Sequence, residues 1–465
     1  MINNEKFEIC SLYRREDFDF DHIQRDKNNP LDQHGYPIYP LTMPSEQGSS
    51  YTYKISNDWF FKRKLQDGGH PHSILSQHHF NQSYNELYGT FDDLGEVIAY
   101  HLANSIIDPQ TKKHIVNVPE YRLATYNNKD QILLRGCISK NVCENSRQRL
   151  VPMTHLLRKS MLSGNSIDVY LKAIEQYAVQ KNFEFDLDSI RRTLIKDSYF
   201  NWKIANSDNH KNNILFRIET PENGRPKLEV CPLIDNGSAY ELSVRYMNDD
   251  NNIRLEQLFT DDNFSRKNEE GNRELAFSHY PYMHTAFKLE PNSLLISDTQ
   301  IAEKNYAYEY CLASEMLSDS DLYHQIYEID RQLTPETAIN AINEKYGASI
   351  KGAQKSINWP PYLKEFMYAT NEFKTKVLTY VVADYYLQSV AMAFESDSIR
   401  KSIAQNYNSI HDEFINTPLQ ASKDLYDVLF VKIANKYGIN IDKSKLASVQ
   451  FKKDNELTKA QQEVN

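Results

Sequence analysis

The stretch Asn206-Ser207-Asp208-Asn209-His210-Lys211-Asn212-Asn213-Ile214 decides the fold, together with the later run Pro232-Leu233-Ile234-Asp235-Asn236-Gly237. A Pro-Glu-Asn-Gly-Arg-Pro turn lies between the two runs. Because Asn-Gly favours a tight antiparallel hairpin, residues on its two arms should pair when their numbers sum to about 447. Asn213 and Asp235 sum to 448, so the hairpin predicts that this amide and this carboxylate lie side by side. Asp208, five residues before Asn213, brings a second carboxylate to the same place.

These three side chains supply only oxygen ligands. Mg²⁺ prefers such hard donors and shares its coordination shell with substrate phosphates. Phosphoryl transfer needs mainly positioning and charge neutralisation, so one Asp that orients the acceptor hydroxyl, with an Asn and an Asp on the metal, is a sufficient set. An Asp, an Asn five residues later, a hairpin and an Asp-x-Gly follow the order of a kinase catalytic loop and its metal-binding Asp. The alternative is that Asp208 and Asn213 only cap turns.

A resemblance to a known family follows from the same residues. Asp208 to Asn213 resembles the D-x-H-x-x-N catalytic loop of HipA-like serine/threonine kinases, and Pro232-Leu233-Ile234-Asp235 resembles their P-x-x-D metal segment. The resemblance covers about residues 50 to 290 and implies ATP and Mg²⁺ as cofactors. It implies Asp208 as the catalytic base, His210 as a further catalytic-loop residue that organises the loop, and Asn213 and Asp235 as metal ligands. For His210, a hydrogen-bonded loop histidine without a chemical role is the alternative.

The nucleotide-binding side of a kinase needs a strand lysine on the phosphates and a helix glutamate that pairs with this lysine. We choose Lys62, which lies in the middle of a predicted strand among large apolar residues, with Lys64 and Lys54 as alternatives. We choose Glu96, because Gly95-Glu96-Val97-Ile98-Ala99-Tyr100 resembles the family's E-x-x-A-x-x-L helix. The alternatives are a solvated strand lysine and a favourable charge near a helix N-terminus.

The sequence departs from the family at the glycine-rich loop. No clear loop of this kind precedes Lys62, and Gly48-Ser49-Ser50 is a poor substitute. Gly352-Ala353-Gln354-Lys355-Ser356 resembles the loop in sequence, but it follows the catalytic loop instead of preceding the lysine. No role is carried over to it.

Composition predicts a globular protein of the reducing cytoplasm. The chain has 465 residues with 40 % hydrophobic and 25 % charged residues, and a mean hydropathy of -0.65. Its net charge of -10 disfavours direct binding to a nucleic-acid backbone. Its five cysteines form no CxxC pair. Met1 to Cys10 lack the apolar run of an export signal. The apolar stretch Val377 to Phe394 contains Asp384, so we expect a buried helix and no contact with a membrane.

The pattern of elements predicts an α+β, bilobal protein-kinase-like fold with a small β-rich N-lobe, a larger helical C-lobe and extra C-terminal helices. The predicted divisions are an N-terminal extension (1–48), the nucleotide-side N-lobe (49–150), the C-lobe core with the catalytic and metal-binding loops (151–295) and a helical C-terminal part (296–465). Predicted strands are Tyr51–Ser56, Trp59–Lys64, Glu120–Tyr126, Gln131–Ile138, Ile214–Arg217 and Lys227–Cys231. Predicted helices are Phe91–Ile107, Met153–Leu162, Ile167–Gln180, Ser189–Ala205 with Asp186 or Asp188 as its cap, Pro361–Phe394 and Lys423–Tyr437.

The function that these patterns favour is a serine/threonine protein kinase that transfers the ATP γ-phosphate to a protein hydroxyl. The family resemblance further implies a toxin–antitoxin setting, an antitoxin partner and a substrate among translation components, such as an aminoacyl-tRNA synthetase. One alternative is a lipid or small-molecule kinase of the phosphoinositide-kinase type, whose D-R-H-x-x-N-I loop fits Asp208 to Ile214 with Asn209 in place of the Arg. A second is a catalytically inactive pseudokinase scaffold, which the missing glycine-rich loop supports.

Overall fold

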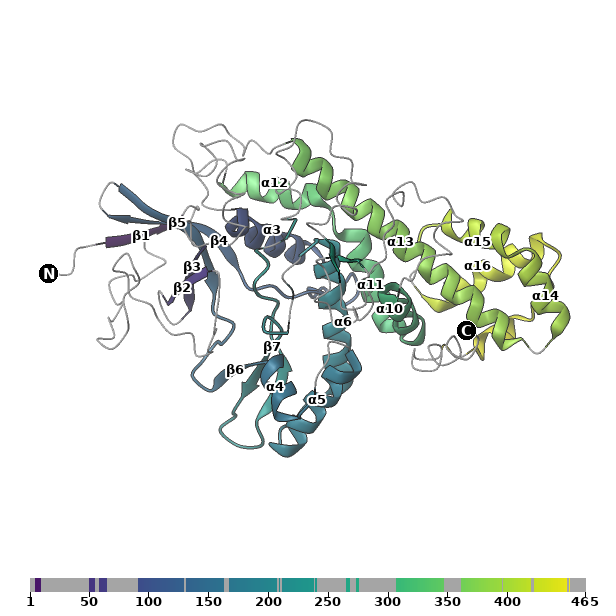
Figure 1. Ribbon diagram of the computed structural model, residues 1–465, viewed down its shortest axis with the longest axis horizontal. Coiled ribbons are helices and arrows are strands. Elements are labelled where there is room, and N and C mark those ends of the chain that lie inside the picture. The colour runs from purple at the N-terminus through teal and green to yellow at the C-terminus, as the bar shows by residue number, and fades with distance from the viewer. Residues whose placement is uncertain are drawn as a thin grey trace.

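The structure is a computed structural model that describes residues 5–9, 50–54, 58–64, 91–128, 131–162, 167–206, 209, 211–237, 239–240, 265–267, 273–275, 307–346, 361–394, 396–419, 422–449 and 451. Antiparallel sheets lie toward one end of an elongated molecule, and helices extend to the other end (Figure 1). The mixture of helices and antiparallel strands confirms the predicted α+β class. The two lobes and the boundaries at residues 48, 150 and 295 stay predictions, and Gly48-Ser49 and Gly352 to Ser356 lie outside the described residues.

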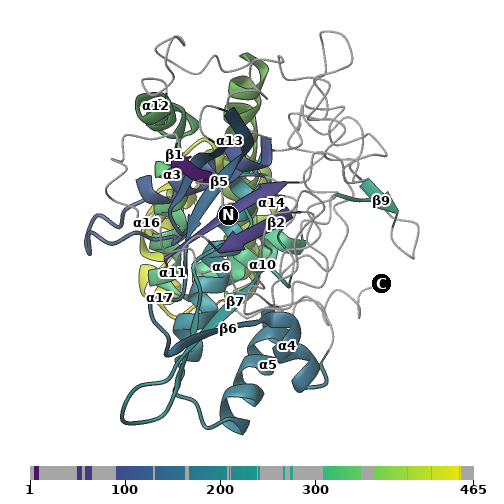
Figure 2. The same cartoon turned by 90° about the vertical axis from the view of Figure 1, so that its left-hand side faces the viewer.

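A five-stranded antiparallel sheet of order β1-β4-β5-β3-β2 carries the predicted lysine. Its strands are β1 (Glu5–Ile9), β2 (Ser50–Lys54), β3 (Trp59–Lys64), β4 (Tyr121–Asn128) and β5 (Gln131–Lys140). The strands predicted at Tyr51–Ser56 and Trp59–Lys64 are confirmed and pair antiparallel, with Ser50 opposite Lys64 and Lys54 opposite Phe60. Figure 2 views this sheet from the end of the molecule at which β1 lies.

Strand β1 lies within residues 1–48, the predicted N-terminal extension, for which no strand was predicted. It pairs with β4 from Glu5 opposite Asn128 to Ile9 opposite Ala124. Phe7 and Ile9 do alternate with charged residues, as in a half-buried strand. The run has only five residues. Its partner is remote in the sequence, so no tight turn connects the two strands and no turn residues predict their pairing.

Helix α3 (Phe91–Ser105) packs against this sheet and is buried on almost every side. Val97, Ile98 and Leu102 are fully buried. One side of α3 contacts β3, β4 and β5, and the helix α12 (Pro335–Tyr346) packs against it as well (Figure 1). A helix that is buried all round is typical of an element enclosed between layers.

A second antiparallel sheet, of order β6-β7-β8, contains the hairpin that joins the two predicted motifs. Its strands are β6 (Gln148–Pro152), β7 (Leu215–Glu219) and β8 (Lys227–Val230). The hairpin is confirmed, but pairs such as Phe216 and Val230 sum to 446, one less than predicted. The connection runs from Thr220 to Pro226 in place of a two-residue bend, because pairing stops at Glu219 and Lys227. Gly224 has a φ of 107°, which explains a glycine in this turn.

The other elements of the described chain are helices, apart from the short strands β9 (Ser265–Lys267) and β10 (Arg273–Leu275). The first group is α4 (Met153–Lys159), α5 (Ile167–Gln180) and α6 (Leu187–Lys203). The second group is α10 (Ala307–Ser318), α11 (Ser320–Gln332), α12, α13 (Pro361–Ala393), α14 (Asp397–Gln405), α15 (Tyr407–Ile415), α16 (Lys423–Lys436) and α17 (Lys443–Ala447). These bounds confirm every predicted helix to within a few residues.

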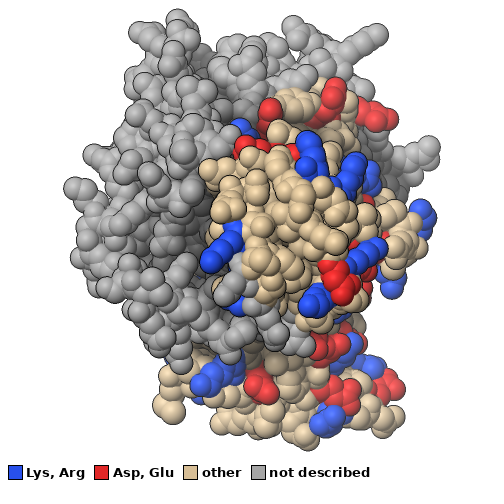
Figure 3. Space-filling view, turned by 90° about the vertical axis from the view of Figure 1, so that its right-hand side faces the viewer, with Lys and Arg blue, Asp and Glu red and all other residues tan. Residues whose placement is uncertain are grey.

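The long helix α13 joins the sheet-bearing part to the C-terminal helices (Figure 1). Its apolar half is buried by the protein itself, as predicted, and Tyr386 contacts the rings of Phe414, Tyr426 and Phe430. Among the described helices, none combines the length and the apolar character needed to cross a membrane. At the end of the molecule that α14 to α17 form, acidic and basic side chains are interspersed on the surface (Figure 3).

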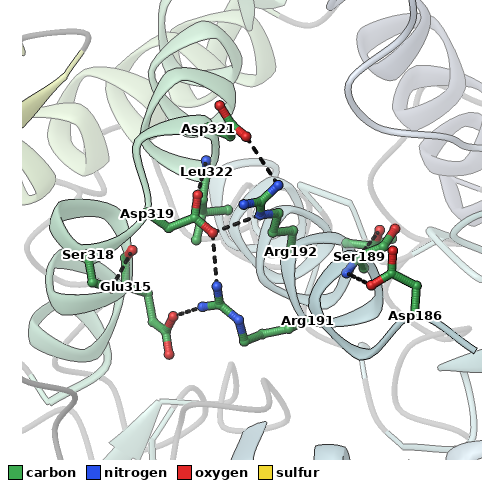
Figure 4. Close-up of polar contacts among 10 residues, drawn as sticks. Asp186, Ser189, Arg191, Arg192, Glu315, Ser318, Asp319, Asp321 and Leu322 are labelled. Atoms are coloured by element: carbon green, nitrogen blue, oxygen red, sulfur yellow. Dashed lines mark hydrogen bonds and ion pairs between the residues drawn. The ribbon is translucent and has the colours of Figure 1, made fainter.

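Ion pairs join helix α6 to α10 and α11 (Figure 4). Arg191 pairs with Glu315 and, at 2.9 Å, with Asp319. Arg192 reaches the same Asp319 at 2.7 Å and Asp321 at 3.2 Å. At the start of α6, Asp186 caps the helix by accepting the Ser189 N–H at 3.0 Å, as one of the two predicted caps. These contacts fix the helix from which the predicted catalytic loop departs.

Glu309 on α10 is a fully buried carboxyl group, and within the described part of the chain neither of its side-chain oxygens has a hydrogen-bond partner. Burial raises its pKa to about 8, although the ammonium group of Lys374 opposes the shift. Between about pH 4.5 and pH 8 the folded chain keeps a proton here that the unfolded chain loses, so this group makes the fold less stable as pH rises. Burial lowers the pKa of Lys374, which acts in the opposite direction, so only a comparison of variants isolates Glu309.

We expect Glu309→Gln to be more stable than the wild type at pH 8 and nearly equal to it at pH 5. The difference in unfolding free energy should grow by at least about 1 kcal/mol over this range, since one pKa unit corresponds to ~1.4 kcal/mol. Urea unfolding at both pH values measures it. Glu175→Gln, exposed on α5, is the control. A difference that shrinks with rising pH would refute the raised pKa.

Candidate active site

Lys62 lies between two carboxylates that come from different parts of the chain. Its Nζ is 2.5 Å from Oε1 of Glu96 on α3, and it also forms an ion pair with Oδ1 of Asp235. Within the sheet, Lys62 is opposite Cys137 of β5 on one side and Thr52 of β2 on the other. The structure thus brings together Lys62, Glu96 and Asp235, the predicted nucleotide-side residues and one predicted metal ligand.

The three side chains differ in solvent exposure, and this decides which of them can contact a ligand. Glu96 is 1 % exposed, Lys62 is 18 % exposed and Asp235 is 36 % exposed. A carboxylate as buried as Glu96 can hold the lysine but cannot reach a ligand in solvent. Asp235 is open enough to bind a ligand and still contact the lysine.

The charges of this cluster depend on one another. Burial alone would lower the pKa of Lys62, but the carboxylates of Asp235 and Glu96 outweigh burial and hold its pKa well above the usual value. Burial raises the pKa of Glu96 against the opposing effect of Lys62. The backbone N–H of Asn236 donates to the second oxygen of Glu96 at 2.8 Å. A buried ion pair needs such additional hydrogen bonds to offset its loss of hydration.

Gly95 allows helix α3 to touch the segment that follows Asp235. A β-carbon at Gly95 would overlap the carbonyl oxygen of Gly237, so a larger residue would separate the two segments. Asp235 itself has a φ of 60°, a left-handed conformation that Asp and Asn adopt more readily than most residues. This close approach places the Asn236 N–H against Glu96 and the Asp235 carboxylate against Lys62.

Three buried asparagines connect the end of α6 to the same segment. Nδ2 of Asn206 donates to Oδ1 of Asn201 at 2.9 Å and to Oδ1 of Asn236 at 3.4 Å. The three residues are at most 2 % exposed. The N–H of Tyr240 adds a bond of 2.9 Å to the carbonyl of Ile204. The start of the predicted catalytic loop is therefore fixed relative to Asp235.

Two buried lysines hold the last turn of α6 from the other side. Nζ of Lys203 donates to Oδ1 of Asp330 at 2.8 Å and to Oγ1 of Thr375 at 2.6 Å. Nζ of Lys374 donates to the carbonyl of Trp202 and lies 5.0 Å from the centre of the Trp202 ring. A lysine near the last carbonyls of a helix also interacts favourably with the negative end of the helix dipole. These contacts anchor the point from which the loop leaves the helix.

Asn213 lines a cavity of about 20 Å³ at the open end of the hairpin. It shares this cavity with Asn209, Pro232 and Leu233. The observed pairing of β7 with β8 ends at Phe216 and Val230, before position 213, so the expectation that Asn213 lies directly beside Asp235 stays a prediction. Asn213 nevertheless lies at the end of the hairpin from which Asp235 departs.

Asp208 and His210 lie outside the described residues, so their roles as catalytic base and loop organiser stay predictions. Asn209, between them, is buried and lines the same cavity as Asn213. The loop thus has described residues on both sides of these two positions. Asn206 at its start bonds the side chain of Asn236, and Asn213 at its end lines the cavity together with Pro232 and Leu233.

The site suits Mg²⁺ bound together with nucleotide phosphates. The described part of the chain contains no group of three His, Cys, Asp or Glu side chains that could hold a metal by themselves. Mg²⁺ in nucleotide enzymes usually takes one or two protein carboxylates and completes its shell with waters and phosphates. The carboxylate of Asp235 and the amide of Asn213 are oxygen donors of the required type. Lys62 supplies the positive charge that phosphates need.

Comparison with known proteins finds a structural likeness to solved structures. No protein family matches the sequence, and no curated protein matches it. Among solved structures, the chain is similar to the crystal structure of CtkA, a proinflammatory kinase of Helicobacter pylori. The two chains share 14 % sequence identity at a TM-score of 0.40, over 72 % of this chain and 90 % of that chain. A likeness this distant leaves the function to be argued from the site itself.

Proposed function

We propose that this chain is an ATP- and magnesium-dependent kinase. The observation that carries the proposal is the meeting of Lys62 with Glu96 and Asp235. A strand lysine paired with a buried helix glutamate, and touching an Asp that follows a hairpin, is the arrangement by which kinases hold nucleotide phosphates and their metal. The two carboxylates that meet at this lysine come from segments far apart in the sequence.

Each residue has a role that its surroundings support. Lys62 contacts the nucleotide phosphates, and the buried Glu96 keeps the lysine in position. The more exposed Asp235, with Asn213, holds Mg²⁺, which when bound neutralises charge on the phosphates. Asp208 accepts the proton of the acceptor hydroxyl, whose oxygen forms the new bond to the γ-phosphorus while the bond from that phosphorus to ADP breaks.

The acceptor is proposed to be a serine or threonine hydroxyl of a protein. The resemblance of the loop Asp208 to Asn213 to HipA-like kinases supports this choice. The same resemblance supports a toxin–antitoxin kinase of the cytoplasm, with an antitoxin partner and a translation component such as an aminoacyl-tRNA synthetase as substrate. The setting, the partner and the substrate are proposed from the family resemblance alone.

Transfer of labelled phosphate tests the proposal. The purified chain is incubated with γ-labelled ATP and Mg²⁺, with and without EDTA, in the presence of protein extract or of phosphoinositide vesicles. Label on protein that disappears with EDTA supports the protein kinase. Label on lipid alone would replace it with a lipid kinase. Saturable binding of ATP with no labelled product in any mixture would replace it with a pseudokinase scaffold.

A further inference from the structure

Just beyond the C-terminal end of helix α3, the end farther from Glu96, a side chain of another helix bonds the backbone. Nε2 of Gln332, the last residue of α11, donates to the carbonyl oxygen of Ile107 at 2.8 Å. The N–H of Ile107 donates back to Oε1 of Gln332 at 3.1 Å. The side-chain amide therefore satisfies both backbone groups of one residue, just past the end of α3 at Ser105.

Helix α12 follows directly and covers α3 with an apolar face. Pro335, Ala338, Ile339 and Ile342 are buried, at the i, i+3, i+4 and i+7 spacing that forms one side of a helix. Glu336, Thr337 and Asn340 on its other sides are exposed. The element that this face contacts most extensively is α3 (Figure 1).

Helix α3 is thus restrained at four places. The sheet supports one side, α12 covers another, Gln332 bonds Ile107 just beyond the helix end, and Gly95 closely approaches Gly237 in the N-terminal half. Only the first and last of these involve the nucleotide-side cluster directly. Because a helix moves largely as a rigid rod, loss of the restraint near Ile107 would allow its opposite end, with Glu96, to shift away from Lys62.

We propose that Gln332 and helix α12 are positioning elements that hold α3 where Glu96 pairs with Lys62. This inference rests on the proposed function, since it assigns the region from Gln332 to Tyr346 the task of setting the affinity for nucleotide phosphates. If α3 takes this position in only a fraction of the molecules, the apparent affinity for nucleotide falls in proportion to that fraction. Saturating nucleotide shifts the remaining molecules to the arrangement that binds.

The neighbouring Arg331 provides a matched control. Nη2 of Arg331 donates to Oε2 of Glu328 at 2.6 Å, and Gln332 donates to the same oxygen. Arg331 is half exposed and makes no described contact with Ile107. Arg331→Ala therefore removes the contact of Arg331 with Glu328, while the pairing of Gln332 with Ile107 remains.

The experiment compares wild type, Gln332→Ala, Ile342→Val and Arg331→Ala by two measurements. Hydrogen exchange of the α3 amides reports how readily the helix opens or loses its packing. Steady-state rates report KM for ATP and kcat. For Gln332→Ala we expect faster exchange in α3 and a KM for ATP raised at least about fivefold, as for loss of one or two hydrogen bonds. The value of kcat should change by less than about twofold. Ile342→Val should show smaller shifts in the same direction, and Arg331→Ala should match the wild type.

The two measurements separate this inference from the proposed function. Unchanged α3 exchange and KM in folded Gln332→Ala and Ile342→Val would overturn the inference, as would a fall in kcat without a rise in KM. If Gln332→Ala fails to fold, Ile342→Val decides on the same criteria. A wild-type chain that neither binds nor consumes ATP would refute the kinase, and α3 exchange would still show whether Gln332 positions the helix.

Discussion

Asp235→Asn should lower the rate of phosphate transfer by about 10²- to 10³-fold, a typical cost of removing one group that stabilises transition-state charge. Asparagine tolerates the positive φ of this position, so the backbone can stay in place. The change removes the negative charge that faces Lys62 and that we assign to the metal. Because Lys62 keeps its contact with Glu96, the fold should remain largely intact.

Initial rates at saturating ATP and Mg²⁺ measure this loss, with thermal unfolding as the check on the fold. Asp188→Asn is the control, since Asp188 is an exposed carboxylate in the first turn of α6. It should keep the wild-type rate. A wild-type rate in Asp235→Asn would remove Asp235 from the chemistry.

Lys62→Met should have the second large effect, on both activity and stability. We expect transfer to fall about 10²-fold or more, because the phosphates lose their cationic partner. We also expect a loss of roughly 3–5 kcal/mol of stability, because the substitution leaves the buried Glu96 without its partner. Urea unfolding and transfer rates measure the two effects separately.

A double variant distinguishes chemistry from folding. Lys62→Met combined with Glu96→Gln removes both buried charges, so it should recover a large part of the stability and none of the activity. Lys64→Met tests the lysine that the sequence leaves as an alternative, and it should keep the wild-type rate. Recovery of activity in the double variant would mean that Lys62 acts only as a structural partner of Glu96.

Local sequence signals predicted the elements of the fold well. The apolar spacing of α3, the cap at Asp186 and the aromatic runs of β2 and β3 all depend on residues close in sequence. Strand β6 escaped prediction because its five residues carry no clear alternation, and its partner β7 comes more than sixty residues later. Pairings of this kind are set by tertiary structure, which local patterns do not record.

The sequence predicted that Glu96 pairs with Lys62, and the structure shows this ion pair. The sequence did not predict that the same lysine also contacts Asp235. It also gave no sign that Asn236 bonds Glu96 through its backbone or that Gly95 allows the approach, since neither depends on a side-chain motif. The register of the hairpin shifted by one because the longer turn from Thr220 to Pro226 replaced the expected bend.

Equilibrium titration with Mg·ATP tests the central claim, a single phosphate site made by Lys62 with its two carboxylates. The binding constant is measured for wild type, Lys62→Met, Glu96→Gln and the double variant. If the pair acts as one unit, each single change should weaken binding at least about tenfold, and the double should bind no more weakly than the worse single, as expected for coupled neighbours. Wild-type affinity in Lys62→Met, or losses that simply multiply in the double variant, would contradict the account.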